Sequence, residues 1–154
     1  MDFKRFLRQL ALFEGIRLNA YQDQVGIWTI GIGTIRYPDG TPVMKGDKIT
    51  LAQAYQYAEV EARHMLAALT KMLKVPQTEE QLIALLSLQY NIGTAGLASS
   101  TVMRSINAKK DIATIERAWL MWNKGTIDGK KVEIPGLATR RKSEIKIYKG
   151  LLKP

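Results

Sequence analysis

The sequence predicts an α+β fold that is mainly helical and has two lobes. A short stretch of alternating apolar residues near the N-terminus indicates a small β-hairpin lobe. An apolar pattern with helical period follows for about six turns, and most later segments repeat that period. With 154 residues, 46% of them hydrophobic, the chain is long enough to form one domain with a proper core.

The first predicted element is a short helix that ends near Glu14. Glu14 directly follows the apolar positions, and Gly15 is suited to ending a helix. A carboxyl group at the end of an apolar face is partly removed from water, so we expect Glu14 to keep a proton near neutral pH and to act as a general acid. The apolar stripe comprises Phe3, Phe6, Leu7, Leu10 and Phe13.

A β-hairpin is predicted next, with alternation from Gly26 to Ile35 that puts Gly31 and Gly33 on the same face as Thr29. Glycines beside a hydroxyl group are expected to leave a shallow groove for a sugar ring. Alone, such a pair can also be a simple twist or bulge, and a glutamate at a helix end can be merely solvated.

Asp23 lies before this strand, in a polar turn that is open to water and should keep its carboxylate ionised. Together, Glu14 and Asp23 are two carboxyl groups in contrasting surroundings. Such a pair can supply one acid and one base, which is the requirement of a glycosidase.

One long helix over about residues 50–73 is predicted to link the lobes. Thr50 and Gln53 have the spacing of a capping box, and Pro76 is expected to end the helix. The hairpin lobe is expected at about 14–49. The helical lobe should comprise about 74–154 together with the N-terminal helix, within a single domain of residues 1–154.

The helical lobe should contain several further elements. Thr78 and Gln81 form a second capping box before a helix that is apolar almost all round, which belongs in the middle of the lobe. Asp111 is suited to capping another helix. A short hairpin is expected at 126–132, and Pro135 should open the last helix.

Three residues carry a resemblance to the phage-type lysozymes, or endolysins. That family's motif is a glutamate, an aspartate nine residues later and a threonine six residues beyond it, and Glu14, Asp23 and Thr29 match both spacings. The likeness continues through 88–93 and 135–144 and covers nearly the whole chain. The resemblance implies the lysozyme-like form of the two-lobed fold predicted above.

The resemblance also implies a function. It predicts a lysozyme that hydrolyses the β-1,4 bond between N-acetylmuramic acid and N-acetylglucosamine in peptidoglycan, without a cofactor, and so lyses bacteria. Glu14 would protonate the leaving oxygen while Asp23 and Thr29 hold the attacking water on the opposite face of the sugar, which inverts the anomeric centre. Arg140 or Arg141 would pair with Glu14 and orient it, and this pairing would oppose the effect of desolvation on the Glu14 pKa, which leaves the sign of the net shift open. The implied saccharide contacts are Ile35, Tyr90, Asn91 and Ser100.

Two other functions stay open. A lytic transglycosylase needs only the acid, so the presence of Asp23 and Thr29 argues against it. A basic module without chemistry could bind cell wall or nucleic acid. The net charge of +9 predicts a salt-sensitive attraction to anionic polymers in any case, without specific recognition of nucleic acid.

Composition restricts cofactors and location. The chain has no cysteine, a single histidine (His64) and no evident carboxylate cluster, so we expect no metal site. It has neither an apolar run long enough to span a membrane nor the apolar core of a signal peptide. We expect a monomer that is made in the host cytoplasm and acts on glycan strands of the cell wall.

Overall fold

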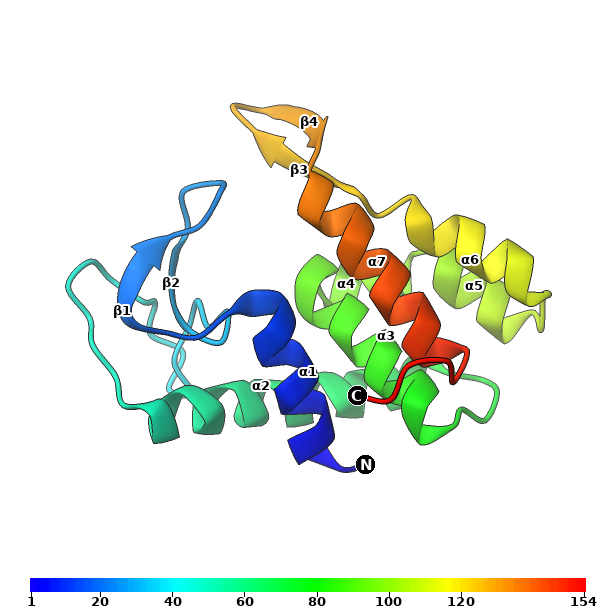
Figure 1. Ribbon diagram of the computed structural model, residues 1–154, viewed down its shortest axis with the longest axis horizontal. Coiled ribbons are helices and arrows are strands. Elements are labelled where there is room, and N and C mark those ends of the chain that lie inside the picture. The colour runs from blue at the N-terminus through cyan, green and yellow to red at the C-terminus, as the bar shows by residue number, and fades with distance from the viewer. The chain divides into compact units, whose positions relative to one another are not determined.

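The computed structural model describes residues 1–154 and confirms the mainly helical α+β prediction (Figure 1). Each of the two sheets has two antiparallel strands. None of the helices has both the length and the apolar character of a membrane-spanning segment. In chain order, the elements are α1 (Phe3–Glu14), β1 (Arg17–Gln22), β2 (Trp28–Gly31), α2 (Leu51–Met72), α3 (Glu79–Ile92), α4 (Thr94–Ala98), α5 (Thr101–Asn107), α6 (Ile112–Leu120), β3 (Lys124–Ile127), β4 (Lys130–Glu133) and α7 (Pro135–Tyr148).

The chain divides into two compact units. The N-terminal unit comprises Asp2–Arg63 and Thr126–Lys130, and the helical unit comprises His64–Gly125 and Lys131–Pro154 together with Met1. The two units share α2. By this division, helix α1 lies in the N-terminal unit. Within that unit the Arg63 guanidinium lies over the Phe3 ring, 4.3 Å from its centroid.

Helix α1 forms as its apolar stripe predicts. The Asp2 side chain caps its start by accepting a hydrogen bond from the Lys4 N–H (2.9 Å), and Phe6 and Leu10 are fully buried. Gly15, with a φ of 71°, ends the helix. The chain then enters β1, which pairs with β2 so that Tyr21 lies opposite Thr29.

Strand β2 is shorter than predicted, because it ends at Gly31 and does not continue to Ile35. The chain turns back at that point, and Ile30 and Thr34 exchange both backbone hydrogen bonds, at 2.8 and 2.9 Å. Gly31 and Gly33 have φ values of 64° and 71°. These left-handed conformations make a tight turn, so the predicted alternation up to Ile35 is wrong.

The prediction of a groove beside Thr29 is also wrong at Gly31. A Cβ atom at Gly31 would lie 3.2 Å from the Ile49 side chain and 3.3 Å from Ala54 on α2. The glycine therefore lets the turn pack closely on α2 and does not border an open surface. Close approach of another backbone is the alternative use of a strand glycine.

Helix α2 begins with the predicted capping box. The Thr50 N–H donates to Gln53 Oε1 (2.9 Å), and the Gln53 N–H donates to Thr50 Oγ1 (3.1 Å). The helix ends at Met72, before Pro76. Asn107 closes its last turn, since its Nδ2 donates to the Met72 carbonyl (2.9 Å) and its Oδ1 accepts from the Lys74 N–H (2.8 Å). This long-range cap ends the helix before the proline does.

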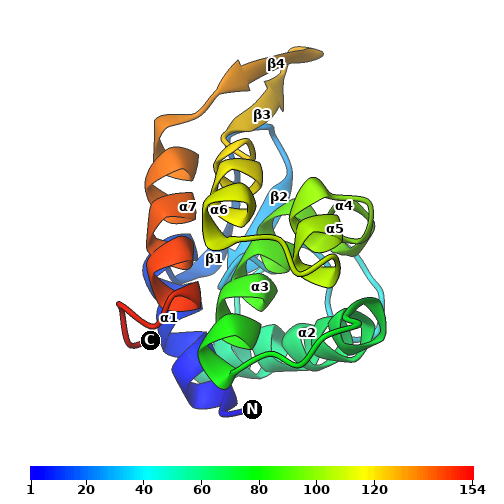
Figure 2. The same ribbon diagram turned by 90° about the vertical axis from the view of Figure 1, so that its right-hand side faces the viewer.

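The helical unit is built around α3, whose residues 83–89 are all buried. Helix α7 packs along α3, and α6 packs against α5 and α7 (Figure 2). The caps predicted at Thr78 and Asp111, the hairpin and the proline that opens α7 are all present. In that hairpin Asp128 and Gly129 both have positive φ, as a two-residue turn between antiparallel strands requires.

Candidate active site

The three predicted catalytic residues lie in the N-terminal unit, on successive elements. Glu14 is the last residue of α1, Asp23 follows β1, and Thr29 is the second residue of β2. Glu14 and Asp23 are partly exposed, whereas Thr29 is only 4% exposed. The carboxyl groups can thus meet solvent or a ligand, while the threonine is held within the unit.

The turn between β1 and β2 is organised around the Asp23 carboxylate. Its Oδ1 accepts hydrogen bonds from the backbone N–H groups of Val25 and Ile27, both at 2.9 Å. The Gly26 N–H donates to the Asp23 carbonyl (3.0 Å), and Gly26 has a φ of 86°. The short side chain of an aspartate commonly stabilises turns in this way. One oxygen of the carboxylate is therefore fixed, and Oδ2 makes no hydrogen bond within the protein.

The Ile27 peptide joins Asp23 to Thr29. Its carbonyl accepts from the Asp23 N–H and from Thr29 Oγ1, both at 2.9 Å, while its N–H donates to the Asp23 carboxylate. Because the Thr29 hydroxyl donates its hydrogen to this carbonyl, its oxygen can only accept further hydrogen bonds. Oδ2 of Asp23 and Oγ1 of Thr29 are thus two acceptor oxygens on one rigid turn.

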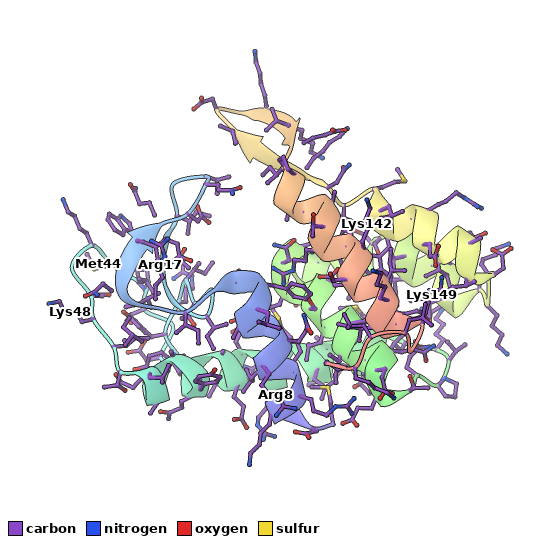
Figure 3. All side chains as sticks on the ribbon, viewed as in Figure 1. Arg8, Arg17, Met44, Lys48, Lys142 and Lys149 are labelled. Carbon is purple, nitrogen blue, oxygen red and sulfur yellow. The ribbon has the colours of Figure 1, made fainter.

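Tyr21 is a further residue beside the candidate catalytic groups, and its spacing from them along the chain does not single it out. It lies directly opposite Thr29 in the ladder, and opposite residues of an antiparallel pair share a face. Burial raises the pKa of Tyr21, and the negative charges of Glu14 and Asp23 raise it further. The Arg17 guanidinium, 4.4 Å from the ring centroid, acts in the opposite direction. Figure 3 shows Arg17 on β1. The two-residue period of a strand, which relates Tyr21 to Asp23, is the sequence signal that could have found it.

The residues implied as saccharide contacts occupy different settings. Ile35 is 47% exposed, in the N-terminal unit. Tyr90 and Asn91 lie in the last turn of α3, in the helical unit, where Asn91 Oδ1 accepts from Arg141 Nη2 (2.9 Å). Ser100 is 4% exposed and caps α5, accepting from the Met103 N–H (3.0 Å).

Arg140 and Arg141, the two arginines considered as partners for Glu14, both contact a buried carboxylate on their own helix. Arg140 Nε lies 3.1 Å from Glu144 Oε1, and Arg141 Nη2 lies 3.0 Å from the same oxygen. Ser87 on α3 donates to Oε1 (2.8 Å), and Trp119 Nε1 on α6 donates to Oε2 (2.9 Å). Glu144 is fully buried and therefore binds α3, α6 and α7 together.

This cluster contains two arginines and one glutamate, so it carries one positive charge in excess. That Arg140 or Arg141 orients Glu14 stays a prediction. His64 is exposed on α2, and no three His, Cys, Asp or Glu side chains in the chain are grouped as metal ligands would be.

Comparison with known proteins gives consistent matches. Residues 11–144 match the family model described as phage lysozyme. The chain is 33% identical over 138 residues to the endolysin of Acyrthosiphon pisum secondary endosymbiont phage 1, covering 90% of each chain. Among solved structures, it resembles an endolysin from Escherichia coli O157:H7 phage FAHEc1, with 42% identity, a TM-score of 0.89 and coverage of 98% of this chain and 94% of that one.

A second solved structure is the muramidase domain of SpmX from Asticaccaulis excentricus. It has 26% identity to this chain and a TM-score of 0.79, and the match covers 97% of this chain and 95% of that domain. Thus the resemblance extends over nearly the full chain in both sequence and fold.

Proposed function

Because this chain belongs to the phage lysozyme family and is therefore a glycoside hydrolase that degrades peptidoglycan, we propose that it cleaves the β-1,4 bond between N-acetylmuramic acid and N-acetylglucosamine with inversion. Glu14 donates a proton to the glycosidic oxygen as the bond breaks. Asp23 and Thr29 bind a water molecule on the opposite face of the sugar, and Asp23 removes its proton as it attacks the anomeric carbon.

The observation that carries this proposal is the pair of acceptor oxygens on the β1–β2 turn. An attacking water needs two acceptors to direct its lone pair. The Ile27 N–H holds the Asp23 carboxylate through Oδ1 and the Ile27 carbonyl holds the Thr29 hydroxyl, which leaves Asp23 Oδ2 and Thr29 Oγ1 as acceptors. An inverting enzyme requires the two carboxyl groups to be about 6.5–9.5 Å apart so that a water fits between sugar and base. A lytic transglycosylase does not use an attacking water. Two residues that position one therefore favour hydrolysis.

We further propose roles for the remaining predicted residues. Ile35, Tyr90, Asn91 and Ser100 contact the glycan strand, and Arg140 or Arg141 orients Glu14 through the excess positive charge of the Glu144 cluster. The protein works as a monomer, is made in the host cytoplasm and reaches the wall from there.

Product analysis on purified peptidoglycan tests the reaction. Glu14→Gln should lower lysis by about 10²–10⁴-fold while the folded state persists, since an amide cannot replace the acid. NMR of the first-formed product should show the α-anomer, because the β-bond is inverted. A first-formed β-anomer would refute inversion. Anhydromuramyl products would instead identify a transglycosylase, and unchanged lysis by Glu14→Gln would refute catalysis by this acid.

A further inference from the structure

A pocket of about 500 Å³ lies in the N-terminal unit, and none of the three catalytic residues lines it. Its walls come from the loop before α2 and from the first turns of α2, where Tyr57 and Gln53 lie one helical turn apart. Met44 and Lys48 lie on that loop (Figure 3). The volume is within the range of about 300–1,000 Å³ that is usual for small-ligand sites.

Two carboxylates in this pocket are each fixed through one oxygen. Asp47 Oδ2 accepts from the Tyr37 hydroxyl (2.7 Å) and from the Met44 N–H (2.9 Å). Asp39 Oδ1 accepts from the N–H (2.9 Å) and the hydroxyl (2.6 Å) of Thr41. The second oxygen of each carboxylate makes no hydrogen bond within the protein. The pocket therefore presents two held acceptors, which call for a ligand rich in hydroxyl or amide donors.

The charges of the titrating groups agree with a ligand that donates hydrogen bonds. Hydrogen bonds from Met44 and Tyr37 lower the pKa of Asp47, and those from Thr41 lower the pKa of Asp39, so both are ionised at neutral pH. Burial and the bond to Asp47 raise the pKa of Tyr37 to about 12, so its ring stays neutral. With Lys48 as the one cation of the lining, the pocket is net negative, which disfavours anionic polymers in a protein of charge +9.

Apolar surface is provided by two aromatic rings. Tyr37 and Tyr57 meet edge to face with centroids 5.6 Å apart, which holds both rings in place. The hairpin that bears Tyr37 starts at Ile35, since the Val43 N–H donates to the Ile35 carbonyl (3.0 Å). Ile35 is a proposed glycan contact, so a glycan bound there would touch the same hairpin that bears Tyr37.

We propose that this pocket is a second saccharide site, which binds an N-acetylated sugar of the glycan strand outside the catalytic residues. Carboxylate oxygens accept from the sugar hydroxyl and amide groups, and the tyrosine rings cover its apolar face. The proposal rests on the proposed function for its substrate class. Its consequence is tighter attachment to polymeric wall, because a second contact on one strand raises the effective concentration of substrate at the first.

The test is an NMR titration of the full chain carrying Glu14→Gln, with tyrosine rings labelled and an N-acetylglucosamine tetramer as the probe. We expect saturable shifts of the Tyr37 and Tyr57 rings. Tyr57→Ala and, separately, Asp39→Ala should weaken the affinity reported there by about tenfold. Tyr55→Ala, a tyrosine on the same helix outside the pocket, is the matched control and should leave that affinity unchanged.

The exposed position of Asp39 ensures that at least one variant keeps its fold. Ring signals of Tyr37 and Tyr57 that stay unmoved while those of Tyr21 saturate would overturn the proposal. Equal affinities of Asp39→Ala and its parent for the tetramer would also overturn it. So would ring signals of Tyr37 and Tyr57 that shift with an alkylammonium ion but not with the sugar. The proposed function fails independently, if the unmodified chain releases no sugar fragments from peptidoglycan.

Discussion

At the scale of single residues, Asp23 combines two roles that are divided between its oxygens. Oδ1 holds the β1–β2 turn through two backbone N–H groups, and Oδ2 is left for the water in the proposed reaction. Mutation of a catalytic base normally lowers activity and leaves stability unchanged. Because the Asp23 carboxylate also supports the local fold, its effect on activity can be separated from its effect on stability only by a substitution that keeps the turn.

Asp23→Asn and Asp23→Ala should therefore differ. The asparagine can still accept both backbone hydrogen bonds, so we expect little change in the free energy of unfolding and a loss of activity of about 10²–10⁴-fold. The alanine should lose the same activity and also about 1–2 kcal/mol of stability, because two N–H groups lose their partner. Urea unfolding beside a lysis assay measures both. Equal stability of the two variants would contradict the anchoring role of Oδ1.

Tyr21 provides a check on how the site is assembled. Since the negative charge of Glu14 contributes to the raised pKa of Tyr21, Glu14→Gln should lower that pKa toward the ordinary value near 10. Titration of the tyrosine rings by NMR measures the shift directly. Glu79→Gln, at the start of α3, is a control that removes a carboxylate in the other unit and should not move it. An unchanged Tyr21 pKa in Glu14→Gln would mean that the acid is not beside this ring.

At the scale of elements, the helical unit depends on one buried carboxylate. Glu144 receives hydrogen bonds from Ser87 on α3, Trp119 on α6 and two arginines of its own helix. A buried pair of this kind contributes little compared with apolar packing, but removing one member leaves an uncompensated charge. Here the loss would leave two buried arginines.

Glu144→Gln should thus destabilise the protein by about 3–5 kcal/mol. A suitable control is Glu116→Gln, which breaks the ion pair to Lys149 (2.6 Å), where both side chains are partly exposed. That variant should cost at most about 1 kcal/mol. Denaturant midpoints of the two variants measure the difference, and a mild effect at Glu144 would refute the view that it anchors three helices.

The sequence predicted those elements whose determinants are local. Thr50 with Gln53 and Thr78 with Gln81 mark helix starts within four residues, and Asp128–Gly129 defines its own turn. Boundaries set by distant partners were not predictable. Helix α2 stops at Met72 because Asn107 caps it, and β2 stops at Gly31 because the turn packs on Ala54.

The same distinction holds for the candidate site. The spacing of Glu14, Asp23 and Thr29 is readable along the chain and still awaits its biochemical test. The hydrogen bonds of the Ile27 peptide, the position of Tyr21 opposite Thr29 and the sharing of Glu144 by two arginines depend on pairing and packing that spacing does not encode.

At the scale of the whole molecule, charge is the dominant property. The net charge is +9, and cationic side chains such as Lys142 on α7 and Lys149, the residue that follows α7, are exposed (Figure 3). Anionic wall polymers should therefore attract the protein over roughly a Debye length, about 8–10 Å at moderate salt.

Lysis of permeabilised cells should accordingly slow as ionic strength rises. A two-site variant, Lys142→Gln with Lys149→Gln, should lower the rate at low salt and flatten its salt dependence, because fewer cations are left to be screened. Turbidity measured from low to high salt gives both curves. A rate that is independent of salt for the parent chain would exclude an electrostatic contribution to wall association.

The burial of Trp119 against Glu144 has a practical consequence for following unfolding. Trp119 is wholly enclosed in the helical unit, whereas Trp28 is half-buried on β2 in the N-terminal unit. Their intrinsic fluorescence should differ in colour, with the enclosed indole emitting at the shorter wavelength. Replacing Trp122 and one of these two by phenylalanine leaves a single emitter in a chosen unit. Denaturation curves recorded from each emitter would then reveal whether the two units lose their structure together or one after the other.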